Sequence, residues 1–408
     1  MGLAPYQFFA LDLGTSKFQL LCLSENKTTK TWAIDAVKVP ANGMHRGMVA
    51  DISAAKVALS QLIDAAEKKF HVDVRKVTVG VAGSHLKPFN TMRSLPLLNQ
   101  HVSKEHIHTL ALDAQKIELD KNRELIHAVH LSYNVDSRPP GDSVLGLSGQ
   151  TLHGKFFVVD ADKNYLRDVI TLCNESGLEV SQFFAEPFAS ASVTLSEEDK
   201  KNGIALIDIG GGTADGVIFM EGKPCHVFTV NIAGHLMTKD LALGLKISTD
   251  EAEKVKFFFG IDTRFDLGVL EVKNLKNHSI LLTAKDVYPI LTARVDELIS
   301  HVEREVEPFR SRLSILLTGG ASHCKGIEKR FFEKTKLDTK TISPNADFFR
   351  SRIGKVELQA ELERSARYAT GLGLLNLTAG KFFDNQENGP NSGKYIQYLW
   401  NWLKELGK

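Results

Sequence analysis

The chain has 408 residues, of which 43% are hydrophobic, 24% are charged and 8% are aromatic. This composition is ordinary for globular domains, so it excludes collagen-like repeats and argues against a disordered or membrane-spanning protein. The 50 basic residues nearly balance the 49 acidic ones, which leaves a formal charge of +1. No basic excess points to nucleic acid as a partner, and the length favours two or more domains.

The N-terminus and the cysteines indicate the cellular compartment in which we expect the protein. The first residues lack the charged start and apolar core of a secretory signal, and no apolar run reaches the roughly 18 residues of a spanning helix. Four cysteines lie far apart without a Cys-x-x-Cys pair, which predicts free thiols rather than disulfides or a zinc module. We therefore expect a cytoplasmic chain, unless something other than a membrane span ties it to a membrane.

Two distant stretches of the chain share one pattern. Phe8–Leu23 and Ile204–Met220 each hold an apolar strand with an Asp at its end, a turn rich in Gly and Thr, and a second apolar strand. They start about 196 residues apart, which is too far for a solenoid repeat. The pattern predicts two similar domains that face one cleft.

Between the two copies, helical and strand patterns flank a segment of different composition. Residues 86–154 are rich in His and contain the turn sequence RPPGD, which predicts a separate inserted subdomain. The patterns around it predict helix 53–70, strand 77–81, and a βαβ unit made of strand 156–160, helix 165–176 and strand 180–184, followed by a helix that opens at Glu186-Pro187.

After the second copy, apolar spacing predicts more helices and a third glycine turn. The expected elements are helix 249–259 with Ser248 or Thr249 as its cap, a long helix 284–310, strand 314–317, the turn 318–326 and a helix around 367–377. Residues 384–393 have no apolar side chain to bury and predict a polar linker.

The glycine turns suggest phosphate binding. Without a Cβ, backbone N–H groups approach phosphate oxygens closely, and an Asp at the strand end can hold a hydrated Mg²⁺. Two such turns, with Asp12 and Asp208, predict phosphates held from both sides. The turns match neither the Walker A motif nor GxGxxG, since residue 215 is Asp. Two tight hairpin turns without a ligand are the simpler alternative.

Five motifs in order resemble those of the actin/Hsp70/sugar-kinase superfamily. They are two phosphate loops (12–17 and 208–215), two connecting helices (186–189 and 369–373) and an adenosine loop (317–321). Residues 252–256 resemble the helix that holds the ribose through Glu253 and Lys256, which share one helix face.

The resemblance implies a site for ATP and Mg²⁺. Glu186 would position the attacking water, although a carboxylate there could simply favour a helix N-terminus. Asp12 and Asp208 would hold Mg²⁺ through water. The implied nucleotide contacts are Asp12, Gly14, Thr15, Ser16, Lys17, Asp208, Gly210, Gly211, Gly212, Thr213, Gly234, Glu253, Lys256, Gly319, Gly320 and Ala321.

Within that superfamily the chain most resembles the FtsA family of bacterial cell division proteins, essentially from end to end. Segments 43–55, 144–159 and 231–245 carry this closer likeness. The adenosine loop departs from the family pattern, because SHCKG follows Ala321 where another Gly and a Pro-Gly are common. The implied fold class is α/β, an actin-like (ribonuclease H-like) duplicated two-domain fold around a nucleotide cleft, with an FtsA-type inserted subdomain.

The same resemblance implies domain boundaries. They are 1–85 and 155–202 for actin-like domain 1, 86–154 for the inserted subdomain 1C, 203–231 and 283–383 for domain 2, 232–282 for the small subdomain 2B, 384–393 for the linker and 394–408 for an amphipathic membrane-targeting helix.

The C-terminal segment predicts a helix that lies in a membrane interface. At about 24 Å it is shorter than a bilayer core of about 30 Å, and it is charged along its length. Packing on its own domain is the alternative. One broad face carries Tyr395, Ile396, Tyr398, Leu399, Trp400, Trp402, Leu403 and Leu406.

The resemblance implies a structural adaptor rather than an enzyme, with slow ATP hydrolysis not excluded. Such a protein polymerises head to tail and anchors the FtsZ ring to the cytoplasmic face of the cell inner membrane at the septum, with other divisome proteins as partners. The alternatives are a PilM-like scaffold, which has no terminal amphipathic helix of its own, and a small-molecule kinase of the same superfamily. An Hsp70-like chaperone fails because fewer than thirty residues follow the nucleotide fold. A metal site in the His-rich insert is disfavoured, since no HExxH motif supports it.

Overall fold

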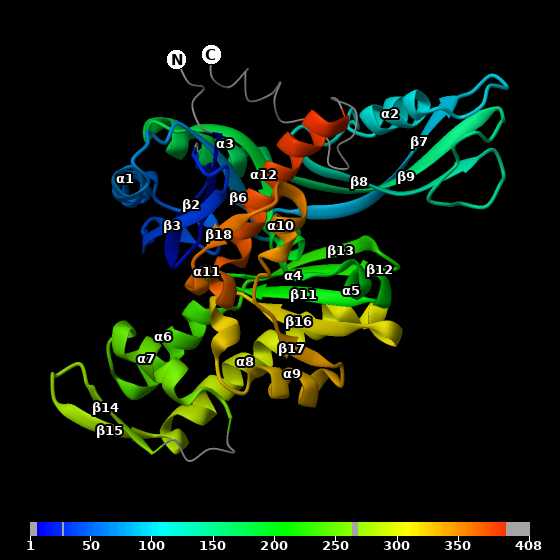
Figure 1. Cartoon of the computed structure of the whole chain (residues 1–408). Coiled ribbons are helices and arrows are strands. Elements are labelled where there is room, and N and C mark those ends of the chain that lie inside the picture. The colour runs from blue at the N-terminus through cyan, green and yellow to red at the C-terminus, as the bar shows by residue number, and fades with distance from the viewer. Residues whose placement is uncertain (1–5, 27, 263–267, 389–408) are drawn as a thin grey trace.

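Two β-sheets form the centre of the molecule, and they share one strand topology except that the first has an additional edge strand, β18 (Figure 1). The computed structural model describes residues 6–26, 28–262 and 268–388. The first sheet has the order β10-β6-β1-β2-β3-β18 and the second the order β13-β12-β11-β16-β17. Their strands are β1 (Gln7–Leu13), β2 (Lys17–Glu25), β3 (Trp32–Pro40), β6 (Lys76–Val81), β10 (Glu179–Ala185), β18 (Val356–Leu358), β11 (Ile204–Ile209), β12 (Ala214–Met220), β13 (Lys223–Val230), β16 (Ser314–Thr318) and β17 (Thr339–Thr341).

The duplication predicted from the two glycine turns is confirmed. Each sheet contains an antiparallel meander, β1-β2-β3 or β11-β12-β13, and the first strand of each meander also pairs in parallel with a later strand, β6 or β16. Each glycine turn connects the last two paired residues of its hairpin. These are Leu13 and Phe18 in one sheet and Ile209 and Ala214 in the other. The two turns are therefore equivalent points of one repeated fold.

Helices cover both sheets and bury their apolar faces on them. In the first domain, α1 and α3 pack on one core, while α4 and α12 pack on another with Leu21 and Leu23. In the second domain, α8 lies at the centre of the core. The helices are α1 (Ile52–Phe70), α3 (Lys163–Glu175), α4 (Glu186–Thr194), α5 (Glu197–Asn202), α6 (Gly234–Leu245), α7 (Thr249–Phe259), α8 (Ala284–Val306), α9 (Ile327–Thr335), α10 (Asp347–Ile353), α11 (Ala360–Arg364) and α12 (Ala369–Asn388), with 3₁₀ turns at Glu307–Arg312, Gly320–His323 and Ala366–Tyr368.

The inserted segment forms a separate three-stranded sheet that projects from the first domain (Figure 1). Its order is β7-β9-β8, and its own apolar core includes Leu110 of the helix that covers it. Its elements are β7 (Lys87–Pro96), α2 (Lys104–Asp113), β8 (Arg123–Val135) and β9 (Thr151–Asp162).

Two smaller hairpins complete the fold. Strands β4 (Met44–His45) and β5 (Met48–Val49) form the first, and β14 (Val269–Lys273) and β15 (Ser279–Thr283) form the second. The second hairpin lies beside α6 and α7, in the segment predicted as a small subdomain (Figure 1). Among the described residues, no helix combines the length and apolarity that crossing a membrane requires.

Three sequence predictions need correction. The βαβ unit is wrong as a unit of one sheet, because β9 pairs antiparallel with β7 and β8 while β10 belongs to the first sheet. For the same reason, the boundary at residue 154 falls inside β9. The linker predicted at 384–393 begins too early, since α12 continues to Asn388.

Candidate functional site

The two phosphate loops lie directly against each other. A Cβ added to Gly211 would lie 1.8 Å from Ser16 Oγ, and one added to Gly212 would lie 2.1 Å from Thr15 Oγ1. These distances are far below van der Waals contact, so only glycine permits this approach. Thr15 Oγ1 also accepts a hydrogen bond from Gly47 N–H at 3.0 Å, which adds the β4–β5 hairpin to the site.

Four carboxyl groups surround these loops: Asp12 and Asp215 are buried, and Asp208 and Glu186 are half-buried. Burial raises the pKa of Asp12 to about 6, against the opposing effect of Lys17. Burial also raises the pKa of Asp215 to about 6 and the pKa of Asp208. The pKa of Glu186 lies well above its usual value because of burial and the charges of Asp12, Asp215 and Asp208. Since buried like charges disfavour ionisation, this site has the chemistry to attract a cation.

The side chains present are compatible with the water-held magnesium that the sequence predicts. Within the described part of the chain, no group of three or more His, Cys, Asp or Glu side chains is arranged to hold a metal ion. Mg²⁺ usually keeps several of its waters and takes few protein ligands beside phosphate oxygens. Asp12 and Asp208, both predicted from the sequence, lie close enough that the charge of Asp208 raises the pKa of Asp12.

Asp208 connects the second sheet to both connecting helices. Its Oδ2 accepts hydrogen bonds from Ser190 Oγ of α4 at 2.7 Å and from Thr370 Oγ1 of α12 at 3.0 Å. The two hydroxyl groups lie 3.2 Å apart. Because the strand and the two helices meet at one carboxylate, a movement at Asp208 must be accommodated by both helices.

Asp215 provides a second contact between the two halves of the site. Its Oδ2 accepts from Thr213 Oγ1, and its Oδ1 accepts from Thr229 Oγ1, both at 2.6 Å. Gly83 N–H, at the start of the insert, donates to the same Oδ1 at 3.3 Å. The second phosphate loop is thereby tied to the base of the insert.

Lys17 points toward the C-terminal part of the fold. Its Nζ donates to the carbonyl oxygen of Arg367 at 2.8 Å and lies 5.4 Å from the centre of the Tyr368 ring. Burial lowers its pKa to about 8, although Asp12 acts in the opposite direction. The ammonium group therefore lies between Asp12 and the segment Arg367–Tyr368.

The predicted adenosine elements converge on Gly234, the first residue of α6. A Cβ on this glycine would lie 3.0 Å from Ala321 Cβ, 3.1 Å from Gly210 O and 3.5 Å from Lys256 Nζ. Gly319 lies beside Asp208, and Gly320 lies beside the side chain of Arg367. The second phosphate loop, the adenosine loop and α7 thus meet at one point.

Glu253 and Lys256 share a helix face, as their spacing predicted. Lys256 Nζ donates to Glu253 Oε2 at 2.6 Å, to Thr238 Oγ1 at 2.8 Å and to Gly234 O at 3.2 Å. These acceptors match the three donors of an ammonium group. Lys256 is buried, whereas the Glu253 side chain is 49% exposed. Lys256 therefore anchors α7 to α6, and Glu253 is the one of the two that a ribose could reach.

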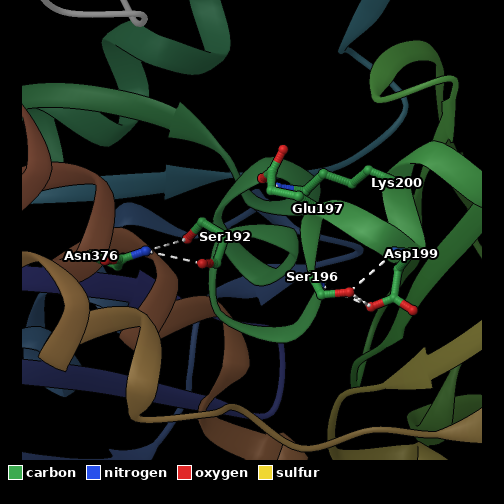
Figure 2. A network of polar contacts seen from close by, with 6 residues as sticks. All are labelled: Ser192, Ser196, Glu197, Asp199, Lys200 and Asn376. Carbon is green, nitrogen blue, oxygen red and sulfur yellow. Dashed lines mark hydrogen bonds and ion pairs between the residues drawn. The ribbon is translucent and has the colours of Figure 1, made fainter.

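The connecting helices cross at close range. A Cβ on Gly373 would lie 1.9 Å from the carbonyl oxygen of Ala189. One helical turn further on, Figure 2 shows the amide of Asn376 donating to Ser192 O at 3.0 Å and Ser192 Oγ at 3.4 Å. In the same view Ser196 caps α5 through its contacts with Asp199.

Sequence reasoning missed several polar residues of this site. Ser190 could have been found, because it lies four residues after Glu186 on the same helix face. Thr370 lies within the second connecting-helix motif, but the motif pattern alone assigns it no role. Thr229, Gly83 and Arg367 carried no local signal, since only the tertiary fold brings them to the site.

Comparison with known proteins agrees with this geometry. The family model described as cell division protein FtsA matches residues 205–373, and the one described as the SHS2 domain inserted in FtsA matches residues 83–160. The chain belongs to the FtsA family of cell division proteins. The second match contains β7, α2, β8 and most of β9, so it also moves the end of the insert beyond the predicted residue 154.

Relatives from two bacteria match nearly the whole chain. The cell division protein FtsA of Neisseria meningitidis is 28% identical over 97% of both chains. That of Pseudomonas aeruginosa is 27% identical over 94% of this chain and 92% of its own. These matches support the resemblance to the FtsA family that the sequence motifs indicate.

Solved structures show the actin-like fold. The PilM–PilN type IV pilus biogenesis complex matches with a TM-score of 0.61 and 18% identity, over 90% of this chain and 97% of the other. MreB5 of Spiroplasma citri, solved with ADP, matches with a TM-score of 0.54 and 15% identity, over 94% and 99%. The α/β fold class predicted from the sequence is thus confirmed, including its FtsA-type insert.

The predicted membrane-facing residues lie outside the described part of the chain. They are Tyr395, Ile396, Leu399, Trp400, Trp402, Leu403 and Leu406.

Proposed function

We propose that this FtsA-family chain binds ATP with Mg²⁺ between its two phosphate loops. The observation that supports this most is the contact of Thr15 and Ser16 with Gly211 and Gly212, from two loops about 196 residues apart in the chain. Backbone N–H groups of both loops would bind phosphate oxygens, and Lys17 would add a charge to them. Asp12 and Asp208 would favour the positive charge that a bound Mg²⁺ brings. The solved MreB5 structures, which carry ADP or AMPPNP, support the choice of nucleotide.

Glu186 is proposed to position water for a slow hydrolysis step. Its carboxylate lies in the first turn of α4 and packs over Gly80 of β6, where a Cβ would come within 2.9 Å of Glu186 Oε1. Burial and the neighbouring carboxylates raise the pKa of Glu186, so its ionised form is a stronger base toward water than an ordinary carboxylate, as general-base catalysis requires. Hydrolysis would serve assembly and disassembly, so the chain acts as a structural adaptor rather than a metabolic enzyme.

The proposed cellular role is that of a membrane anchor for the division ring. The chain would polymerise head to tail, with the insert facing the neighbouring subunit. Its small subdomain, around 232–282, would bind FtsZ, and the helix at 394–408 would hold it to the cytoplasmic face of the cell inner membrane at the septum, among other divisome proteins. Family membership and the aromatic and lysine content of the tail support this role.

The discriminating experiment is co-sedimentation with acidic liposomes, with and without ATP–Mg²⁺. The full chain should pellet with lipid and recruit purified FtsZ, whereas a chain lacking residues 393–408 should remain in the supernatant. A full chain in which Trp400 and Trp402 are replaced by Glu should behave like the truncation, and Lys404→Gln should retain most binding, because the apolar face supplies most of the affinity. Full lipid binding by the truncated chain would contradict the proposal.

A PilM-like scaffold is the second candidate, favoured by the structural match to the PilM–PilN complex. It predicts no lipid binding by the tail and no recruitment of FtsZ. A small-molecule kinase predicts phosphate transfer to an added sugar or alcohol, so release of ADP that depends on such a substrate would favour it.

A further inference from the structure

A histidine of the insert contacts the helix that carries Glu186. The backbone N–H of Ala185 donates to Nε2 of His127 at 2.9 Å. Ala185 is the N-cap residue of α4, and no side chain of its own caps that helix. The residue that follows is Glu186. An acceptor from a different subdomain therefore holds the backbone immediately before the proposed water-positioning carboxylate.

The position of His127 follows from an irregularity in β8. Leu125 pairs with Asp160 and His127 pairs with Val159, so Ile126 is an extra residue in β8, which makes a β-bulge. A bulge bends its strand and redirects the side chains beside it, and bulges are frequent near active sites. Strand β10, which ends at Ala185, is the edge strand of the first sheet, and β8 lies against it without a ladder. The imidazole supplies the hydrogen bond that a neighbouring strand would otherwise provide.

The surroundings leave the imidazole little freedom. His127 is 5% exposed, and its ring stacks on Phe184 at 5.7 Å and contacts Phe188 at 4.9 Å between ring centres. These two aromatic residues come from β10 and from α4, on either side of Ala185. An acceptor confined in this way fixes the amide that it binds, and with it the direction in which α4 begins.

We propose that His127 is a positioning residue for hydrolysis: by accepting the Ala185 N–H bond, it sets the start of α4 and hence the place of the Glu186 carboxylate. The inference rests on the role proposed above for Glu186. It makes the insert part of the hydrolytic machinery, although no residue of the insert is among the predicted nucleotide contacts. A displacement of about 1 Å in a catalytic group can lower a rate by about 100-fold, so a single hydrogen bond at this point has a large effect.

The test compares His127→Leu with His127→Gln in the full chain. The amide oxygen of Gln can occupy the place of Nε2 and accept the bond, whereas Leu keeps the volume and removes the acceptor. We expect His127→Leu to lower the single-turnover rate of ATP hydrolysis by about 10-fold or more while the Kd for ATP changes less than about 2-fold. His127→Gln should recover most of that rate. Hydrogen exchange of a peptide containing Ala185 should be faster in the Leu variant than in the Gln variant.

A matched control lies on the same strand. His130 stacks on Tyr133 at 3.7 Å between ring centres, within the insert. His130→Leu should therefore leave hydrolysis unchanged. In a Glu186→Gln background, His127→Leu should cause no further loss, because a residue that acts only through Glu186 has nothing left to position.

Each other outcome overturns the inference in a distinguishable way. A normal rate for His127→Leu, a Gln variant as slow as the Leu variant, or a loss that adds to that of Glu186→Gln would show that His127 does not position Glu186. A normal rate for Glu186→Gln would remove the catalytic role of Glu186 and this inference together, whereas ATP binding is judged separately from the Kd.

Discussion

The carboxyl groups of the site determine how the protein without nucleotide responds to pH. The folded pKa of Asp12 is about 6, above its usual value of 3.8, and burial is the main cause. When a carboxyl group binds its proton more tightly in the folded state, the free energy of unfolding of the protein falls as the pH rises between those two values. The protein thus carries a destabilising charge at neutral pH, at the place where Mg²⁺ and phosphate are proposed to bind.

We predict that Asp12→Asn stabilises the nucleotide-free protein more at pH 7.5 than at pH 4.5, by about 2 kcal/mol. Urea unfolding at both pH values measures this difference. Asp286→Asn is the control, because the hydrogen bonds of Thr283 lower the pKa of that exposed carboxylate. The effect of Asp286→Asn should be nearly the same at both pH values, since the pKa of Asp286 lies below its ordinary value of 3.8. An equal effect of Asp12→Asn at the two pH values would contradict the prediction.

Gly319 tests how closely the adenosine loop approaches Asp208. Its φ is +87°, and a Cβ would lie 2.2 Å from Asp208 Oδ1. Gly177 has a similar φ of +81° but nothing within 4 Å of the added Cβ. Gly177→Ala should therefore lower stability by about 1 kcal/mol from backbone strain alone. Gly319→Ala should lower it further and weaken ATP binding at least about 10-fold, as calorimetry can show; equal effects of the two substitutions would exclude a steric role for Gly319.

At the scale of elements, α4 and α12 cross where the first domain contacts the second sheet. Gly373 allows the backbones to touch at Ala189 O, and Ser190 and Thr370 bind Asp208 from the two helices. Polar contacts continue along the pair to Ser192 and Asn376 (Figure 2). A change at the second phosphate loop can therefore reach both helices through hydrogen bonds.

We predict that Gly373→Ala separates these helices and lowers the free energy of unfolding by about 3 kcal/mol. The matched variant is Gly371→Ala, whose Cβ would meet the side chain of Leu21 rather than a backbone atom. A side chain can move aside, so this second substitution should cost less. Chemical denaturation of both variants provides the measurement, and a greater loss for Gly371→Ala would be evidence against close backbone packing at residue 373.

At the scale of the whole molecule, the insert touches both domains. It is continuous with the first domain, and Gly83 at its base binds Asp215 of the second. Further out, Lys223 of β13 lies 3.0 Å from Asp142 in the insert. The side chains of this pair are 35% and 79% exposed, so the pair adds little to global stability. We expect the pair to act instead on the orientation of the insert relative to β13.

We predict that Lys223→Glu changes the thermal midpoint very little but broadens the distance distribution between spin labels on the insert and on the second domain. Combining it with Asp142→Lys restores an opposite-charge pair and should narrow the distribution again. The same distribution in the wild type and both variants would mean that this ion pair does not hold the insert. High salt should weaken the effect, because exposed charges are screened.

The sequence alone determined the repeated units and their turns. Each hairpin and each amphipathic helix depends on residues close together in the chain, so α1, α7, α8 and the two phosphate loops could be read from local patterns. The order of the motifs was sufficient to predict the duplicated fold. The sharing of one helix face by Glu253 and Lys256 was also predictable, because a helix determines the direction of side chains three residues apart.

Only the tertiary structure decided which distant groups meet. β9 reads locally as a strand of a βαβ unit, but its antiparallel partners lie in the insert. Ser190, Thr370 and Asp208 form one hydrogen-bonded group, although α12 begins more than 150 residues after β11. The hydrogen bond from Ala185 to His127 depends on a β-bulge and on an edge strand, and the local sequence predicts neither of them. Such contacts follow from packing across the whole fold, where the energy of many weak interactions decides the geometry of a few polar ones.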